Sequence, residues 1–141
     1  MYTIKTKSSF DSAHFLAGYS GKCRNIHGHR WTVEIEVGDM KLEEAGKIRE
    51  MVVDFSDLKN DLREKTEELD HCLIMENGTL KEETLKALHA ENFKIVELPF
   101  RPTAEKLAEY FYNYMQNKGY KVIRVSVYET PNNIATYTKD I

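Results

Sequence analysis

This 141-residue sequence lacks, or has little of, several features that mark particular classes of protein. It has 2 cysteines, Cys23 and Cys72, which are too few for a framework of disulfides. No apolar run approaches the roughly 20 residues that a membrane-spanning helix needs, and the first residues lack the apolar stretch of a signal peptide. We therefore expect a cytoplasmic protein with reduced thiols and no membrane partner.

An excess of positive charge is also missing. The chain has 20 Lys and Arg against 23 Asp and Glu, a net charge of −3 and a pI of about 6.0. No overall basic field therefore indicates a nucleic-acid partner. Hydrophobic residues make up 41% and charged residues 30%, an ordinary composition for a globular protein. The length suits a single domain, which we expect over residues 1–141.

The pattern of apolar residues predicts both strands and helices. Alternation predicts strands over 2–14, 31–37, 51–55, 120–130 and 134–137. Helical spacing predicts helices over 56–69, with Ser56 as N-cap, and over 102–117. The charged segment 77–97 is interpreted as an added helix centred on 80–89. Because strands and helices do not alternate regularly, we expect an α+β fold whose mainly antiparallel sheet is covered by helices on one face.

Three of the 5 histidines suggest a metal site. His27 and His29 are separated by one residue, so on a strand both imidazoles would project from one face, together with Trp31. His14 ends the expected strand 2–14, and a neighbouring strand could thus supply the third imidazole. Three neutral imidazoles with an open fourth position suit a catalytic zinc ion. The alternative is a chance surface His-x-His pair and an unrelated core histidine.

Cys23 and the pair Asp70-His71 are candidates for proton transfer. Lys22 and Arg24 flank Cys23, and cationic neighbours favour the thiolate form, which acts as a base or nucleophile. A carboxylate beside a histidine can fix its tautomer and raise its basicity. The alternatives are a small buried cysteine and a histidine that interacts with the dipole of the preceding helix.

Glu129 ends the expected strand 120–130 as Tyr128-Glu129-Thr130. A carboxylate at this position can accept two parallel hydrogen bonds, from the 2-amino and N3–H groups of a guanine-like or pterin ring. A solvated glutamate at a strand end is the alternative.

Six short motifs follow one another along the chain. They are Phe10-x-x-Ala13-His14, Cys23-x-x-x-His27-Gly28-His29, Val53-Asp54-Phe55 with Leu58-Lys59, Leu69-Asp70-His71, Pro102-Thr103-x-Glu105 and Glu129-Thr130. In this order and spacing they resemble the 6-pyruvoyl-tetrahydropterin synthase / 6-carboxytetrahydropterin synthase family nearly end to end.

The resemblance implies a role for each matching residue. His14, His27 and His29 would bind Zn²⁺, and Cys23 would accept a proton. Asp70, His71 and Glu129 would form a proton relay, and Glu129 would also anchor the pterin. Further substrate contacts would come from the motif residues Thr130, Thr103 and Glu105, and the candidates for the triphosphate are Lys22 and Arg24.

The resemblance also implies the T-fold, an antiparallel four-stranded sheet with two helices on one face. Such sheets close into a barrel across three subunits, and two trimers form a homohexamer whose active sites lie between subunits. Asp70 and His71 would then serve the metal and cysteine of a neighbour. Segment 77–97 is longer than in compact members of the family, and we expect it to be an exposed helical insertion.

The implied substrate is the small molecule 7,8-dihydroneopterin triphosphate. We favour a 6-carboxy-5,6,7,8-tetrahydropterin synthase, which releases acetaldehyde and triphosphate on the route to queuosine and other 7-deazapurines, because the chain is short and lacks N-terminal extensions. The alternative within the family is a 6-pyruvoyl synthase, which eliminates triphosphate from the same substrate. Two other classes stay open: a zinc- or pterin-binding protein without turnover, and a zinc hydrolase with Glu129 as base.

Overall fold

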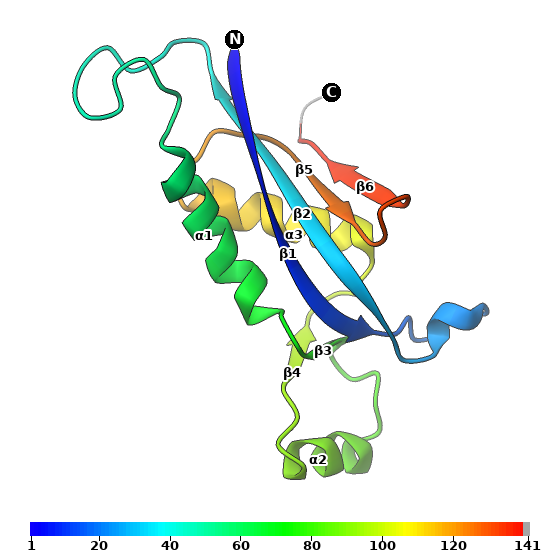
Figure 1. The fold of residues 1–141 in the computed structure, drawn as a ribbon. Helices are drawn as coiled ribbons and strands as arrows, with labels where there is room; N and C mark the ends of the chain where they lie inside the picture. Colours follow the sequence, from blue (N-terminus) through cyan, green and yellow to red (C-terminus); the bar gives the residue numbers. More distant parts are fainter. Residues whose placement is uncertain (140–141) are drawn as a thin grey trace.

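A curled sheet with helices on one side forms the fold (Figure 1). The computed structural model describes residues 1–139, so the last two residues of the expected domain, 140–141, lie outside the described residues. The sheet order is β4-β3-β1-β2-β5-β6. The strands are β1 (Tyr2–His14), β2 (His27–Asp39), β3 (Leu73–Glu76), β4 (Ile95–Leu98), β5 (Val122–Tyr128) and β6 (Ile134–Tyr137). The helices are α1 (Phe55–Glu68), α2 (Glu82–Ala90) and α3 (Ala104–Asn117).

The long hairpin of β1 and β2 is the centre of the sheet. Its antiparallel register runs from Tyr2 opposite Asp39 to His14 opposite His27. Alternation along both strands places Phe10 and Trp31 on one face, where their rings stack with centroids 6.0 Å apart. The strand expected over 31–37 therefore extends back without a break to His27.

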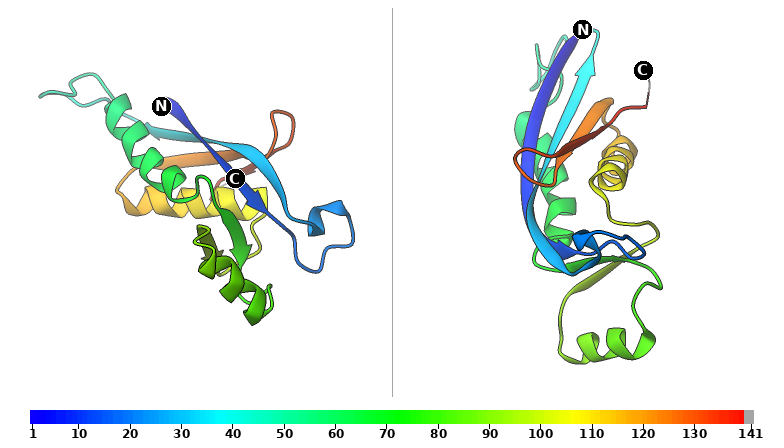
Figure 2. Two further views of the ribbon diagram at one scale, coloured as in Figure 1. Left: turned by 60° about the horizontal axis from the view of Figure 1, so that its bottom comes forward. Right: turned by 90° about the vertical axis from the view of Figure 1, so that its right-hand side faces the viewer.

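Helices α1 and α3 both pack on this face, as expected for an α+β fold (Figure 2). Leu58 and Leu62 of α1 and Leu107 and Phe111 of α3 are fully buried. The ring of Phe111 lies 6.2 Å from that of Phe10. The helices thus cover the apolar side of the sheet.

The opposite face of the sheet is polar along β1 and β2. Lys7 pairs with Glu34 at 3.6 Å, and Arg30 pairs with Asp11 at 2.9 Å. Among residues 1–139, no helix is long and apolar enough to cross a membrane.

The sheet is larger than the expected four antiparallel strands, and it is mixed. Strand β3 pairs in parallel with the end of β1, and β4 pairs in parallel with β3. Each of these two strands has 4 residues that do not alternate between apolar and polar, Leu-Ile-Met-Glu in β3 and Ile-Val-Glu-Leu in β4, so the sequence carries no strand signal there. Segment 77–97 does contain a helix, α2, as expected, but its last residues belong to β4. It is thus a crossover between two parallel strands rather than a simple helical insertion.

Residues 51–55 do not form the expected strand. The Met51 carbonyl accepts a hydrogen bond from Glu43 N at 3.0 Å, so this backbone closes a local loop instead of joining the sheet. Asp54 then caps α1, because its carboxylate accepts hydrogen bonds from the backbone N–H of Ser56 and of Asp57. The N-cap is therefore Asp54, and the expectation of Ser56 was wrong.

Candidate metal centre and surrounding active site

The three histidines of the sequence motifs converge at the end of the central hairpin. His14 ends β1, and His27 and His29 begin β2, with His14 opposite His27 and Ser12 opposite His29. One ligand atom from each imidazole lies within 4.8 Å of the others. The ring centroids are 4.6, 4.9 and 5.1 Å apart. The strand parity expected from the sequence thus brings all three rings to one face.

Backbone carbonyls fix the tautomers of two of these rings. Nδ1 of His14 lies 2.8 Å from the Pro102 carbonyl oxygen, and Nδ1 of His27 lies 2.7 Å from that of Asn25. A carbonyl can only accept, so both Nδ1 atoms are protonated and donate. In neutral rings both Nε2 atoms then carry lone pairs, which face each other across 3.1 Å. A shared cation relieves this repulsion, and the site therefore fits a metal ion.

Burial favours the neutral form of two of these imidazoles. His14 is 1% exposed, and burial lowers its pKa to about 4, although the hydrogen bond to Pro102 acts in the opposite direction. Burial likewise lowers the pKa of His29, against the attraction of Glu129. Nε2 of His29 is buried without a hydrogen-bond partner. This nitrogen is thus a candidate for the third ligand, since neutral imidazole is the form that binds a metal.

Cys23 lies in the loop that joins the two metal-site strands. It is half-buried and sits in a 3-10 turn, Lys22–Arg24, whose two basic side chains are exposed. The Cys23 carbonyl accepts a hydrogen bond from Leu16 N at 2.9 Å, which closes the loop. The described contacts do not join its Sγ atom to the imidazoles. The structure therefore places Cys23, Lys22 and Arg24 in the loop between the two strands that carry the three histidines.

Two of the four expected ring contacts, Glu105 and Glu129, line one cleft beside the histidines. Glu129 directly follows β5, and its Oε1 atom lies 3.8 Å from Nε2 of His29. Glu105, in the first turn of α3, and Glu129 both line a cleft of about 330 Å³. Thr103 is the N-cap of α3, where its hydroxyl accepts from Lys106 N. The Thr130 hydroxyl similarly accepts hydrogen bonds within its own turn.

Asp70 and His71 form a contact pair after α1. Nδ1 of His71 lies 2.8 Å from Oδ2 of Asp70, and Oδ1 of Asp70 accepts from Asp11 N at 2.8 Å. This backbone hydrogen bond, followed by the one with His71, lowers the pKa of the Asp70 carboxyl. His71 has a φ of 54°, a left-handed conformation that costs on the order of 1–3 kcal/mol and must be held by its surroundings. The side chain of His71 is 78% exposed.

This pair borders a cleft that also reaches one histidine of the cluster. His71 lines a cleft of about 710 Å³ together with Ala13, Gly28, Arg30 and His29. The ring of His71 contacts Asp70 at 2.8 Å. Among residues 1–139, no described contact joins this ring to His14, His27 or His29.

Three contributors to the site were missed from the sequence. The carbonyls of Pro102 and Asn25 orient two imidazoles, and backbone groups leave no residue-type signal. Arg101 donates to the Ala17 carbonyl at 2.7 Å and so ties the Cys23 loop to the segment before α3. In the sequence, the one sign of a role for Arg101 is that it directly precedes the Pro102-Thr103-x-Glu105 motif.

Comparison with known proteins agrees with this arrangement. A family model described as 6-pyruvoyl tetrahydropterin synthase matches residues 3–140. A 6-carboxy-5,6,7,8-tetrahydropterin synthase from Haemophilus influenzae is 34% identical, with 97% of this chain and 99% of that protein covered. The enzyme of the same name from Aquifex aeolicus is 35% identical, with 84% and 77% covered.

Solved structures show the same fold at lower identity. An uncharacterized protein from Wolinella succinogenes has a TM-score of 0.80 at 22% identity, with 99% of this chain and 98% of that chain covered. The 6-pyruvoyl tetrahydropterin synthase of Plasmodium falciparum has a TM-score of 0.69 at 22% identity, with the same coverage. The match to the family model over nearly the whole chain, and the relatives above 30% identity, establish that this chain belongs to the 6-pyruvoyl tetrahydropterin synthase family.

Proposed function

We propose that this protein is a zinc-dependent 6-carboxy-5,6,7,8-tetrahydropterin synthase. It converts 7,8-dihydroneopterin triphosphate and water to 6-carboxytetrahydropterin, acetaldehyde and triphosphate. The observation that carries the proposal is the convergence of ligand nitrogens from three imidazoles beside a cleft with two carboxylates. The names of its relatives from Haemophilus influenzae and Aquifex aeolicus support this choice of product.

His14, His27 and His29 hold the metal. Three neutral nitrogen ligands with an open position are typical of catalytic zinc. Bound there, zinc supplies Lewis acidity toward the hydroxyl oxygens of the substrate side chain. The hydrogen bonds from Nδ1 of His14 and of His27 to backbone carbonyls keep the rings oriented and raise their basicity as ligands.

Glu129 positions the pterin ring. Its carboxylate accepts hydrogen bonds from the 2-amino and N3–H groups, which orients the substrate side chain toward the histidines. Glu105 lines the same cleft and provides a second acceptor for the ring. Thr103 contributes by beginning α3 where the Pro102 carbonyl meets His14, and Thr130 by shaping the turn after Glu129.

Cys23 and His71 transfer protons. Cys23 takes a proton from the substrate side chain, and His71, oriented by the Asp70 carboxylate, returns or relays one. Lys22 and Arg24 extend from the loop of Cys23 and bind the triphosphate. The hydrogen bond from Arg101 to the Ala17 carbonyl holds the loop of Cys23 against the segment before α3.

The active site is completed by a neighbouring subunit. Among residues 1–139, no described contact joins the His71 ring to the histidines of its own chain, and its ring contacts Asp70; His71 would therefore serve the metal centre of a neighbouring subunit. The exposed His71 side chain and the cleft around it are suited to a contact between subunits. We therefore infer a homohexamer built from two trimers, in which closing the barrel also covers free sheet edges.

The second candidate is a 6-pyruvoyl tetrahydropterin synthase, which the description of the matching family model favours. It would use the same residues and eliminate triphosphate without cleaving a carbon–carbon bond. Incubation of the metal-loaded protein with 7,8-dihydroneopterin triphosphate, followed by mass spectrometry, tests both candidates. Acetaldehyde in a 1:1 ratio to 6-carboxytetrahydropterin supports the first, and a 6-pyruvoyl product without acetaldehyde overturns it.

A further inference from the structure

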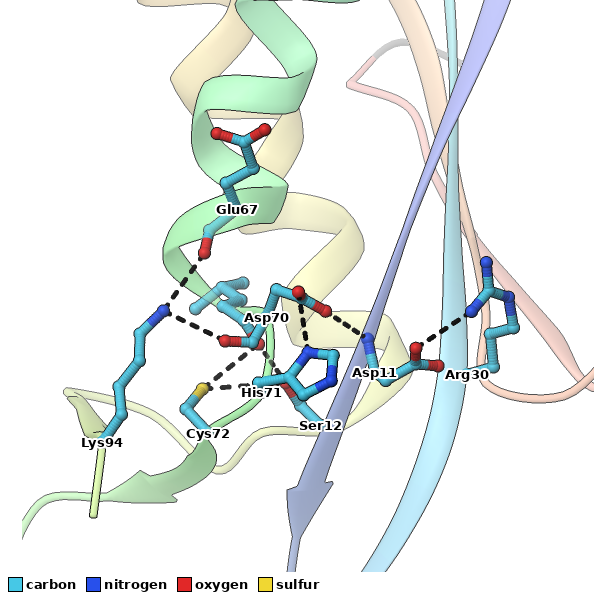
Figure 3. A network of polar contacts seen from close by, with 9 residues as sticks. Asp11, Ser12, Arg30, Glu67, Asp70, His71, Cys72 and Lys94 are labelled. Atoms are coloured by element: carbon cyan, nitrogen blue, oxygen red, sulfur yellow. Dashed lines mark hydrogen bonds and ion pairs between the residues drawn. The ribbon is translucent and has the colours of Figure 1, made fainter.

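One lysine of segment 77–97 reaches the Asp70–His71 pair. Lys94 lies between α2 and β4, and its ammonium donates to the carbonyls of Glu67, at 3.1 Å, and of Asp70, at 3.0 Å (Figure 3). The last carbonyls of a helix lack partners within the helix, and a lysine is well suited to bind them. The side chain therefore bridges the end of α1 to the residue before His71.

The turn at His71 is held from two sides. On the side of β1, His71 N donates to the Asp11 carbonyl at 2.7 Å, and Asp11 N donates to the Asp70 carboxylate at 2.8 Å. On the side of β4, Lys94 holds the Asp70 carbonyl, and the Lys94 carbonyl accepts from Leu73 N at 3.1 Å. The left-handed backbone of His71 is thus clamped between a central strand and the crossover segment.

The contacts of Lys94 indicate a specific role rather than a surface ion pair. The ion pairs found within residues 1–139 do not include its ammonium, which is directed to two main-chain oxygens instead. Its charge also lies close enough to Asp70 to contribute, after Asp11 and His71, to the low pKa of that carboxyl. Lys94 therefore affects both the position of Asp70 and the ionisation of its carboxylate, which orients His71.

We propose that Lys94 is a positioning residue for His71, and that segment 77–97 contributes to catalysis through this one residue. This inference rests on the proposed function, in which His71 transfers a proton. Lys94 acts through the backbone of the Asp70–His71 turn and not by contact with the substrate.

The test is the Lys94→Met substitution in the full-length, metal-loaded protein. Methionine keeps a linear side chain and removes the donors. We expect kcat to fall about 10- to 100-fold, because small displacements of a catalytic group have effects of this size, while KM stays within about twofold and the metal content is unchanged. Lys94→Arg, which can donate to both carbonyls, should restore most of the rate.

Lys86→Met is the matched control. Lys86 lies in α2 of the same segment and pairs with Glu82 at 3.2 Å, and their side chains are 76% and 83% exposed. This variant should retain the wild-type kcat. A loss in Lys86→Met equal to that in Lys94→Met, or a Lys94→Met variant that Lys94→Arg does not rescue, would overturn the inference.

A second experiment, in which the parent protein is the His71→Ala variant, separates this inference from the proposed function. In His71→Ala, the further change Lys94→Met should leave the residual rate unaltered, because coupled residues are not additive. A further drop by the same factor shows that Lys94 does not act through His71 and overturns the inference. Wild-type turnover in His71→Ala removes the proposed role of His71 itself. An inactive His71→Ala beside a fully active Lys94→Met removes only the role of Lys94.

Discussion

The buried histidine of the metal centre should make the metal-free protein sensitive to mild acid. Burial lowers the pKa of His14 from 6.5 to about 4, although the Pro102 carbonyl opposes the shift. As the pH falls, the unfolded chain takes up this proton first and the folded chain does so later. Folding stability is therefore lost between about pH 6.5 and pH 4, and it is regained above this range.

The size of the effect follows from this shift in pKa. Each pKa unit corresponds to roughly 1.4 kcal/mol, so the full contribution of His14 is about 3 kcal/mol. About 2 kcal/mol of it should be lost between pH 7.5 and pH 5. The nearly complete burial of His14, at 1% exposed, is the reason that solvent does not weaken the effect.

Urea unfolding of the chelator-treated protein measures this loss, at a fixed protein concentration at both pH values. His14→Asn is the comparison, because its amide nitrogen can still donate to Pro102 and it has no titrating group. The wild type should lose about 2 kcal/mol more than His14→Asn between pH 7.5 and pH 5. Equal pH dependence in the two proteins would refute burial as the dominant influence on His14.

Three further substitutions test other parts of the site. Cys23→Ala should keep the metal, as measured by elemental analysis. It should lower kcat by roughly 100-fold or more, as expected for loss of a general base. A variant with normal turnover would contradict the role of Cys23. Glu129→Gln should raise KM about tenfold or more, because a hydrogen bond to a charged group contributes about 1.5–3 kcal/mol. Unchanged substrate affinity in a titration would contradict the role of Glu129. Thr103→Ala removes the N-cap of α3 and should lower the free energy of unfolding by about 1 kcal/mol. Thermal or urea unfolding measures this loss. An unchanged free energy of unfolding would indicate that water replaces the hydroxyl.

The cluster of three histidines was predictable because its geometry is local. The interval between His27 and His29 and the clear alternation of β2 were enough to place both rings beside Trp31 on one face. The third ring followed from the strand that ends at His14. By contrast, the sequence carries no sign of which backbone carbonyls will meet these rings, because Pro102 is brought there by the folded chain.

The parts that were missed depend on contacts between distant segments. Strands β3 and β4 lack an alternating pattern of apolar and polar residues, and their parallel pairing becomes defined only when β1 provides an edge. The apolar run at 51–55 was interpreted as a strand, although the Asp54 carboxylate commits the next residues to helix α1. In both places a contact outside the local pattern decides the structure.

Because all three imidazoles come from one hairpin, the metal ion that we propose would bind tightly only when the two strands pair in the native register. If β1 slipped by one residue against β2, every side chain of the slipped strand would change sides. His14 would then point away from His27 and His29, and tight chelation would be lost. Metal loading during biosynthesis would thus select the chains whose central hairpin has been assembled in the native alignment.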